Sequence, residues 1–312
     1  MYWMGIDIGS ISTDMVLIDE ASSIATSVYL KTKSRPAEAV REALRRLGAS
    51  YSSNEIAGVG VTGSGRYLGA AMTGADVVKN EITAHARAVS HIDPQIKTVI
   101  EIGGQDSKII IMEDGLVSDF AMNTVCAAGT GSFLDRQAER MGVSIEELGR
   151  MAARADKCTP IAGRCAVFAE SDIIHKQQTG AGEEELMAGM CMALAKTYIS
   201  NVAKGKKINE RICFQGGVAA NPGMVRAFEE ILERPVFVPD EHKIMGALGA
   251  ALLAKEKTAG PTKFKGFEVG NVQISLKSLD CDGCSNGCSI TAVQANGNTS
   301  GYFGDRCGKY SS

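Results

Sequence analysis

The sequence lacks the features that mark several classes of protein. Its apolar stretches are no longer than a strand, and the opening segment MYWMGIDIGS has no basic region followed by an apolar one. We therefore predict no membrane-spanning helix and no secretion signal, and expect a cytoplasmic protein. An excess of positive charge is also missing, because 33 basic residues face 36 acidic ones. This balance argues against binding to nucleic acid or to an anionic membrane.

Cysteine is too scarce for a disulfide scaffold, whereas glycine is abundant. In a chain of 312 residues, nine cysteines indicate core thiols and metal ligands in a reducing compartment. The 35 glycines follow no collagen-like period and indicate tight turns of the kind that approach phosphates closely. The length is sufficient for one large or two ordinary domains.

Hydrophobic patterning predicts an α/β protein with an internal duplication. Strands 4–9 and 14–18 flank one short turn, and strands 98–103 and 107–112 flank a second, which suggests two copies of one unit with a nucleotide in the cleft between them. Further strands are expected over 56–62 and 211–215, and helices over 36–48, 79–90, 127–141, 144–155, 166–178, 183–205, 222–233 and 244–256. We predict a first domain over 1–93 with 244–258, a second over 94–243, and a Cys-rich appendix without clear helix over 261–312.

Three glycine-rich segments have the composition of a phosphate-binding site. They are Asp7-Ile8-Gly9-Ser10, Glu101-Ile102-Gly103-Gly104-Gln105-Asp106 and Gln215-Gly216-Gly217-Val218-Ala219-Ala220-Asn221. Glycine lets backbone N–H groups converge on phosphate, and a nearby carboxylate can hold the waters of Mg²⁺. In this order they resemble the two phosphate motifs and the adenosine motif of the actin, heat-shock-70 and sugar-kinase ATPases. That resemblance implies two ribonuclease-H-like domains with an ATP cleft between them.

Two cysteines immediately precede predicted helices. Cys126 stands in NTVCAAGTGSFLD and Cys165 in GRCAVFAESDI. The positive end of a helix stabilises a negatively charged iron–sulfur cluster, and a twofold axis could supply the two thiolates that one chain lacks. Ordinary buried thiols are the alternative at both positions.

A family resemblance favours the cluster. From Met4 to about Glu256 the chain resembles the ATP-dependent activators (component A, archerase) of the 2-hydroxyacyl-CoA dehydratases, which are related to the ATPase subunits of benzoyl-CoA reductase. The segments that carry it are GIDIGS, NEITAHARA, IEIGGQDSK, CAAGTGSFLD, GRCAVFAESDI, GGVAAN and MGALGAAL. The resemblance implies an anaerobic homodimer that binds ATP or ADP and shares one [4Fe–4S] cluster, held by Cys126 and Cys165 of each chain. It further implies ferredoxin or flavodoxin as electron donor and an iron–sulfur dehydratase or reductase as acceptor.

The resemblance also assigns roles to individual residues. Asp7, Glu101 and Asp106 would hold Mg²⁺ through water, and Gln105 would orient the attacking water. The turns Gly9, Ser10, Ile11, Ser12, Thr13 and Gly103–Asp106 would cradle the phosphates, and Gly216, Gly217, Ala220, Lys243 and Gly246 would border the adenosine. The chain departs from the pattern at Asp14, where relatives carry Lys, and at Glu101, where they carry Asp. An acid near ATP should repel phosphate, so we expect slow hydrolysis or an outward-facing Asp14.

The remaining alternatives concern the appendix and the type of activity. Cys281, Cys284, Cys288 and Cys307 have a spacing close to that of a zinc ribbon or a small iron–sulfur site, and an unmetallated tail is the other interpretation. A small-molecule kinase of the same superfamily is the main alternative function. A nucleotide-switched binding protein is a third, but residues 261–312 are too few for a peptide-binding domain. A kinase has no use for paired thiols at helix starts.

Overall fold

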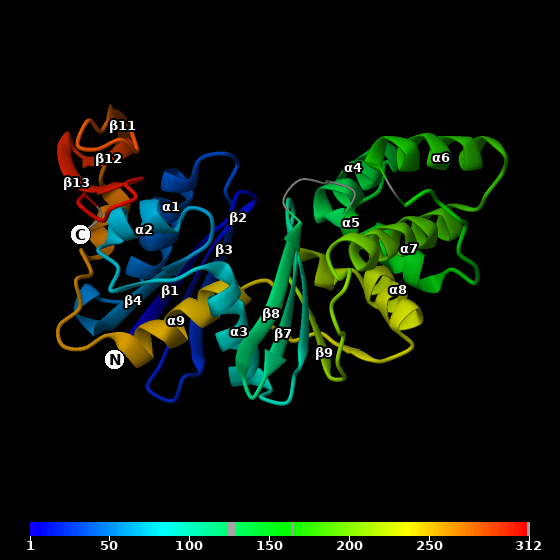
Figure 1. Cartoon of the computed structure of the whole chain (residues 1–312), viewed down its shortest axis with the longest axis horizontal. Helices are drawn as coiled ribbons and strands as arrows, with labels where there is room; N and C mark the ends of the chain where they lie inside the picture. Colours follow the sequence, from blue (N-terminus) through cyan, green and yellow to red (C-terminus); the bar gives the residue numbers. More distant parts are fainter. Residues whose placement is uncertain (124–128, 164, 311–312) are drawn as a thin grey trace. The chain divides into compact units, whose positions relative to one another are not determined.

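Two compact units make up the chain in the computed structural model, which describes residues 1–123, 129–163 and 165–310 (Figure 1). Unit 1 comprises Met1–Ala88 and Gly246–Ser312, and unit 2 comprises Val89–Met245. The domain bounds expected from the sequence stay a prediction. Among the described residues, no helix combines the length and the apolar character needed to span a membrane.

Unit 1 contains a five-stranded sheet with the order β3-β2-β1-β4-β5. The first three strands form an antiparallel meander, and β4 and β5 continue the sheet in parallel with β1. The elements around this sheet are β1 (Tyr2–Ile8), β2 (Ser12–Ile18), β3 (Ile24–Lys31), α1 (Pro36–Gly48), β4 (Ile56–Thr62), α2 (Arg66–Thr73), β5 (Val77–Val78), α3 (Glu81–Ile92, which runs into unit 2) and α9 (Met245–Lys257).

Helix α9 packs directly on the backbone of this sheet. A Cβ at Gly5 of β1 would lie 1.8 Å from the carbonyl oxygen of Ala247, and one at Gly60 of β4 would lie 2.1 Å from that of Ala250. Glycine at these two positions therefore allows an approach that no larger residue permits. This close packing fixes the start of α9 above the end of β1, where Asp7 lies.

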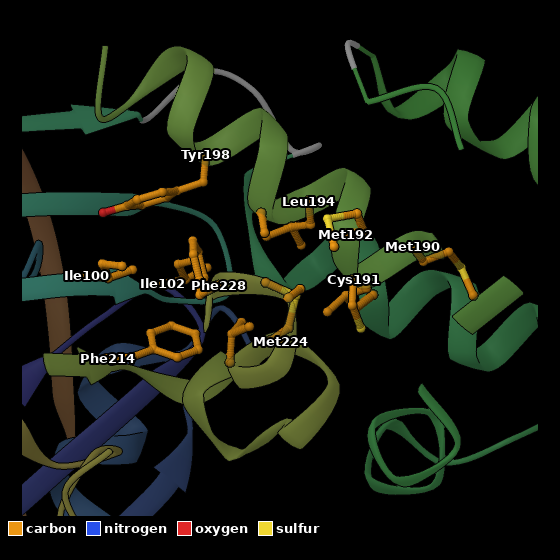
Figure 2. Packing of buried hydrophobic residues seen from close by; sticks show 14 of the residues in the cluster. Ile100, Ile102, Met190, Cys191, Met192, Leu194, Tyr198, Phe214, Met224 and Phe228 are labelled. Carbon is orange, nitrogen blue, oxygen red and sulfur yellow. The ribbon is translucent and has the colours of Figure 1, made fainter. Parts of the chain in front are cut away.

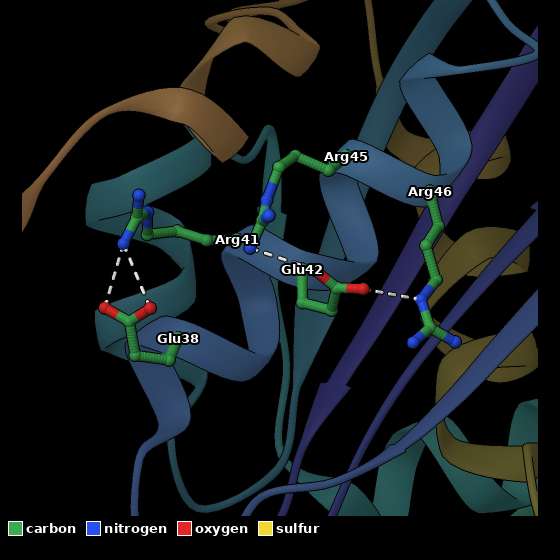
Figure 3. Close-up of polar contacts among 5 residues, drawn as sticks. All are labelled: Glu38, Arg41, Glu42, Arg45 and Arg46. Carbon is green, nitrogen blue, oxygen red and sulfur yellow. Dashed lines mark hydrogen bonds and ion pairs between the residues drawn. The ribbon is translucent and has the colours of Figure 1, made fainter.

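Helix α1 presents an apolar face to the sheet and a charged face to solvent. Pro36 begins the helix, and Val40, Leu44 and Leu47 are buried. On the outer face, Arg41 pairs with Glu38 at 2.9 Å, and Glu42 pairs with Arg45 and Arg46 (Figure 3). Such exposed pairs contribute little to stability and mainly keep this face soluble.

Residues 261–310 belong to unit 1 and contain a three-stranded antiparallel sheet in the order β11-β12-β13. The strands are β11 (Ile274–Asp280), β12 (Ser289–Ala295) and β13 (Asn298–Phe303). Phe267 is buried, and its Cβ would be 2.7 Å from a Cβ placed on Gly48 of α1. The Asp76 carboxylate accepts hydrogen bonds from the Thr262 hydroxyl at 2.6 Å and from the Lys263 amide at 2.8 Å. This segment is thus attached to unit 1 by buried apolar and polar contacts.

Unit 2 repeats the strand order of unit 1, because its sheet has the order β10-β9-β6-β7-β8. Again three strands form an antiparallel meander and two follow in parallel. The duplication expected from the sequence is therefore present in the topology. The elements of unit 2 are β6 (Thr98–Ile102), β7 (Ser107–Glu113), β8 (Leu116–Asn123), α4 (Gly131–Met141), α5 (Ile145–Arg154), α6 (Ala166–Gln178), α7 (Glu183–Asn201), β9 (Ile212–Gln215), α8 (Pro222–Leu232) and β10 (Val236–Phe237).

The core of unit 2 lies between its sheet and the helices α7 and α8. Figure 2 shows Tyr198 and Leu194 of α7 beside Ile100 and Ile102 of β6, with Phe228 of α8 among them. The rings of Tyr198 and Phe228 meet edge to face with centroids 5.4 Å apart. The stripe on α7 that the sequence predicts, formed by Leu186, Met190, Leu194 and Ala195, is buried as expected.

Most predicted helices and strands are present, and the differences have local causes. The prediction missed β3 and α2, because β3 has no fully buried residue and α2 lies in a glycine-rich stretch. It also missed the strands of residues 261–312, whose sequence is polar and rich in glycine. Cys126 lies outside the described residues, and the helix predicted over 127–141 begins only at Gly131, with Thr130 as its N-cap.

Candidate functional site

In unit 1 the predicted phosphate turn joins β1 to β2. The Gly9 amide donates to the Ser12 carbonyl oxygen at 2.8 Å and closes the turn, with Ser10 and Ile11 exposed at its tip. The Thr32 hydroxyl donates to the Gly9 carbonyl oxygen at 2.9 Å and shares a second hydrogen bond, 3.0 Å long, with the buried Thr13 hydroxyl. Thr13 thus supports the turn from inside, while Ser10 and Ile11 lie exposed at its tip.

The Asp7 carboxylate lies against two glycines. A Cβ on Gly63 would be 2.4 Å from Asp7 Oδ1, and a Cβ on Gly246 would be 1.9 Å from Asp7 Oδ2. Gly63 follows β4 with φ +90°, and Gly246 lies in the first turn of α9. The positive end of a helix favours an ionised carboxylate at this position. Any larger residue at Gly63 or Gly246 would therefore collide with the Asp7 carboxylate.

Asp14 is buried, so the outward orientation considered for it is wrong. It lies opposite Asp7 in the β1–β2 ladder and is only 4% exposed. Directly opposed residues in an antiparallel pair project to the same face of the sheet, so β2 holds the Asp14 carboxyl beside that of Asp7. Burial and then the charge of Asp7 raise the pKa of Asp14 well above its usual value.

The corresponding turn of unit 2 joins β6 to β7 and has the same closure. The Gly103 amide donates to the Asp106 carbonyl oxygen at 3.0 Å, and Gln105 is exposed at the tip. Glu101 lies opposite Lys108 in the ladder, as Asp7 lies opposite Asp14 in unit 1. The Lys108 ammonium donates to Glu101 Oε2 and to Asp106 Oδ2, both at 2.9 Å. Lys108, which was not predicted as a site residue, therefore fixes both carboxylates expected to hold the waters of Mg²⁺.

The third glycine-rich segment lies against Glu101. Gly216 follows β9 with φ +89°, and a Cβ on it would be 2.4 Å from the Ile102 carbonyl oxygen and 2.8 Å from Glu101 Oε1. The Gly216 amide donates to the His242 carbonyl oxygen at 2.8 Å. Within unit 2, the fold thus brings the second and third predicted motifs together.

Comparison of the two units identifies site residues that the sequence prediction missed. Gly63 corresponds to Gly216, because both follow the parallel strand beside the phosphate hairpin with nearly the same φ and both contact the first acid of that hairpin. Thr62 beside Asp7 likewise corresponds to Gln215 beside Glu101. An alignment of the segments VTGSG and FQGGV could have revealed this correspondence.

Three of the five residues expected to border the adenosine lie at the surface, whereas Gly216 is half-buried and Gly246 is buried. Gly217, Ala220 and Lys243 are exposed in unit 2. Asn221 caps α8 as predicted, since its side-chain oxygen accepts from the Met224 amide at 3.1 Å. These positions stay predictions for nucleotide contacts.

The phosphate turn of unit 2 is bonded directly to the start of α4. The amides of Gly131 and Ser132 donate to the carbonyl oxygens of Gly103 and Gly104, each at 2.9 Å. At its outer face, α4 pairs with α6 through Glu170, which lies 3.5 Å from Arg136 and 3.3 Å from Arg140. The hydrogen bonds and ion pairs therefore connect the turn to α4 and, through α4, to α6.

Cys165 occupies the N-cap position of α6 with an extended backbone, and its thiol is half-buried. Its side chain makes no capping hydrogen bond, so the first amides of α6 receive none from it. The positive end of the helix dipole lies at this position, which suits a ligand of a negatively charged cluster. Its predicted counterpart, Cys126, lies outside the described residues.

The tail thiols do not assemble into a metal site in the described part of the chain. There, no three His, Cys, Asp or Glu side chains come together to hold a metal ion. The Cys281 amide donates to the Cys288 carbonyl oxygen at 2.9 Å and closes the loop between β11 and β12, which carries Cys284. Cys307 is exposed beyond β13.

Cys191 and Cys213 are core thiols, as predicted, and we expect them to resist alkylation. Each is 1% exposed, and burial raises the pKa of each to about 12. At pH 8 the thiolate fraction of such a group is on the order of 10⁻⁴, and no reagent reaches the sulfur without unfolding. After treatment with iodoacetamide and a chelator, mass spectrometry should find Cys284 and Cys307 modified and these two intact. Modification of Cys191 or Cys213 before unfolding in urea would contradict the assignment.

Two relatives are similar to the chain over their whole length. The 2-hydroxyisocaproyl-CoA dehydratase activator of Clostridioides difficile is 34% identical over 276 residues, which are 87% of this chain and 100% of the relative. The activator of lactoyl-CoA dehydratase of Anaerotignum propionicum is 33% identical over 260 residues, which are 82% of this chain and 98% of the relative.

Solved structures of activators also match. Component A of the Acidaminococcus fermentans (R)-2-hydroxyglutaryl-CoA dehydratase has a TM-score of 0.76 at 34% identity, over 82% of this chain and 98% of that chain. The 2-hydroxyisocaproyl-CoA dehydratase activator of Clostridium difficile with bound ADPNP has a TM-score of 0.74 at 33% identity, over 84% and 100% of the two chains.

A glucokinase of the ROK family from Streptomyces griseus shares the fold alone, with a TM-score of 0.53 at 13% identity over 82% of this chain and 100% of that chain. The fold is thus the one that activators share with sugar kinases. The model of the BadF/BadG/BcrA/BcrD ATPase family matches residues 4–254. With its repeated sheets, its two phosphate turns and this match, the chain belongs to the BadF/BadG/BcrA/BcrD ATPase family.

Proposed function

We propose that this protein is an ATP-driven electron donor. It hydrolyses ATP and delivers a low-potential electron to an iron–sulfur enzyme such as a 2-hydroxyacyl-CoA dehydratase. The observation that carries the proposal is the similarity to dehydratase activators over their whole length. That similarity favours an activator over a small-molecule kinase, with which only the fold is shared.

Nucleotide binding is supported by the two hairpin turns. In each unit the tip of the turn is exposed, and an acid lies where a Cβ on the neighbouring glycine would collide with it. Asp7, Glu101 and Asp106 would hold Mg²⁺ through water, with Lys108 keeping the last two in place. Backbone amides and Mg²⁺ together would neutralise the phosphate charge that develops during hydrolysis. Gln105, exposed at the tip, would orient the water.

The second cofactor would be a [4Fe–4S] cluster held by Cys126 and Cys165 of each of two chains. Cys165 fits the role of a cluster ligand, because its thiol is half-buried at the start of α6 and thiolate sulfur is the usual ligand of such clusters. When bound, the cluster supplies one-electron chemistry at low potential. The chain's own part is to bind it through Cys126 and Cys165 and to exclude water.

A homodimer is supported by the surface beside Cys165. Val167 and Phe168, in the first turn of α6, are each 68% exposed. Two large apolar side chains next to a proposed ligand fit burial against the same helix of a second chain, in an isologous interface.

Coupling between nucleotide and cluster follows from the contacts of α4. Because the amides of Gly131 and Ser132 bond to the phosphate turn, a change in that turn on hydrolysis would move the start of α4. The ion pairs of Glu170 would pass this movement to α6 and so to Cys165. The helices would thereby change the surroundings of the cluster at the moment of electron transfer.

Anaerobic purification tests the proposal. We expect a brown dimer with about four irons per two chains, bleached by oxygen, that reduces a 2-hydroxyacyl-CoA dehydratase only with ATP. Cys126→Ala and Cys165→Ala should each lose the iron and retain ATP binding, whereas Cys158→Ala, a half-buried thiol outside the proposed ligand set, should keep both. A colourless monomer that phosphorylates a sugar would refute the proposal.

A metal site in the appendix is a separate proposal. We expect Cys281, Cys284, Cys288 and Cys307 to bind one zinc ion or a small iron–sulfur site once metal draws them together. Metal analysis of the Cys165→Ala protein should then find zinc or iron that is lost in a variant also carrying Cys281→Ser and Cys284→Ser. Equal metal content in the two proteins would exclude a tail site.

A further inference from the structure

Arg66 is a half-buried arginine at the edge of the sheet that carries the phosphate turn of unit 1. It begins α2 directly after the turn Gly63-Ser64-Gly65, which follows β4. Because β4 runs parallel to β1, both strands end at the same edge of the sheet, where β1 continues into the phosphate turn. The Gly65 amide donates to the carbonyl oxygen of Ile8, the last residue of β1, at 2.8 Å. This hydrogen bond fixes the start of α2 beside the phosphate turn.

The guanidinium group of Arg66 is held in place but has no acidic partner. Its Nη1 donates to the Gly63 carbonyl oxygen at 3.1 Å, and its central carbon lies 4.7 Å from the centre of the Tyr67 ring. Among the described residues, no carboxylate forms an ion pair with it. Arginine presents five N–H donors in a planar fork, and only one of them is used here. The group is therefore oriented and still has donors for an anion.

The equivalent position of unit 2 carries no charge. Gly63 corresponds to Gly216, and the third residue after each donates its amide to that glycine's carbonyl oxygen at 3.2 Å. This residue is Arg66 in unit 1 and Ala219 in unit 2. Ala219 is buried in the core of unit 2, in the segment expected to border the adenosine. The duplicated fold thus has a cationic side chain after only one of its two corresponding glycines.

We propose that Arg66 binds the phosphates of the nucleotide, an inference that rests on the proposed function. A guanidinium forms charge-assisted, bidentate hydrogen bonds with phosphate oxygens, and it stays charged at every pH at which the protein is folded. The phosphate turn beside it is the part of unit 1 proposed to hold these phosphates. Tyr67 is a positioning residue, because its ring keeps the guanidinium in place through a cation–π contact.

Calorimetric titration with ADPNP, a non-hydrolysable ATP analogue, tests this role. Arg66→Met should weaken ADPNP binding at least tenfold, because charge-assisted hydrogen bonds are lost. The affinity should also depend less steeply on the KCl concentration, since salt then screens one cationic contact fewer. Tyr67→Leu should weaken binding about two- to fivefold, and Tyr67→Phe, which keeps the ring, should recover most of that loss.

The matched control is Arg234→Met. Arg234 is exposed in unit 2, and its Nη1 likewise donates to a backbone carbonyl oxygen, that of Ile208, at 3.2 Å. This variant should bind ADPNP as the wild type does. Equal affinity of Arg66→Met and Arg234→Met would overturn the role of Arg66 and leave the proposed function intact. An unchanged dependence on KCl in Arg66→Met would do the same, whereas a wild-type protein that binds no ADPNP would contradict the proposed function itself.

Discussion

Lys108→Met is expected to lower the free energy of unfolding by about 3–5 kcal/mol, because it removes the ammonium that pairs with the buried Glu101 carboxylate. The Lys108 ammonium is 2% exposed and lies 2.9 Å from both Glu101 and Asp106. Methionine keeps most of the side-chain volume, so the loss reports the charge rather than a cavity. Urea unfolding followed by circular dichroism measures it. ATP hydrolysis should fall at least tenfold, since neither acid is then held for Mg²⁺.

The matched control for this change is Lys206→Met. Its ammonium pairs with Asp119 at 2.7 Å, but that carboxylate is half exposed and water replaces the lost partner. We expect little change in unfolding or in ATP hydrolysis. Adding Glu101→Gln to Lys108→Met should recover part of the stability but not the activity. If the two Lys→Met variants unfold at the same urea concentration, Lys108 does not have the role assigned to it.

Gly246→Ala is expected to weaken ATP binding at least tenfold, because the added methyl group would be 1.9 Å from Asp7 Oδ2. Either the Asp7 carboxylate or the first turn of α9 must move, and such overpacking also costs about 1–3 kcal/mol of stability. Calorimetric titration with a non-hydrolysable ATP analogue measures the affinity, and thermal melting measures the stability.

Gly182→Ala serves as the control for a methyl group added near a helix start. A Cβ at Gly182 meets only the Glu185 side chain at 3.8 Å, which is ordinary contact. This variant should bind nucleotide as the wild type does. Unchanged affinity in Gly246→Ala would show that the position of Asp7 is not what the nucleotide requires.

Much of the candidate site was predictable because its signals are local. The turns at Gly9 and Gly103 are specified by glycine between apolar strands, and Cys165 directly precedes the segment that forms α6 within the predicted bounds. Each of these features depends on residues within a few positions along the chain. The core thiols Cys191 and Cys213 follow in the same way from the apolar segments around them.

The sequence could not predict which charged residues pair, because the order and register of the strands determine which side chains lie opposite one another. Asp14 was expected to face outward or to slow hydrolysis, and its burial follows from covering elements that lie elsewhere in the sequence. The sequence shows Lys108 seven residues after Glu101, but only the antiparallel ladder places its ammonium on both acids. The roles of Gly63 and Thr62 appear once β4 lies beside β1.

The sequence by itself determined the family motifs, the two β-turn-β repeats and the helix that begins at Cys165, since apolar periodicity, glycine and helix-start signals act over short distances. Only the tertiary structure decided that Lys108 pairs with Glu101, which glycines face a carboxylate, and that Phe267 packs against α1. These properties depend on desolvation and on contacts between distant segments, and a side chain acquires its electrostatic surroundings only when the sheet is assembled.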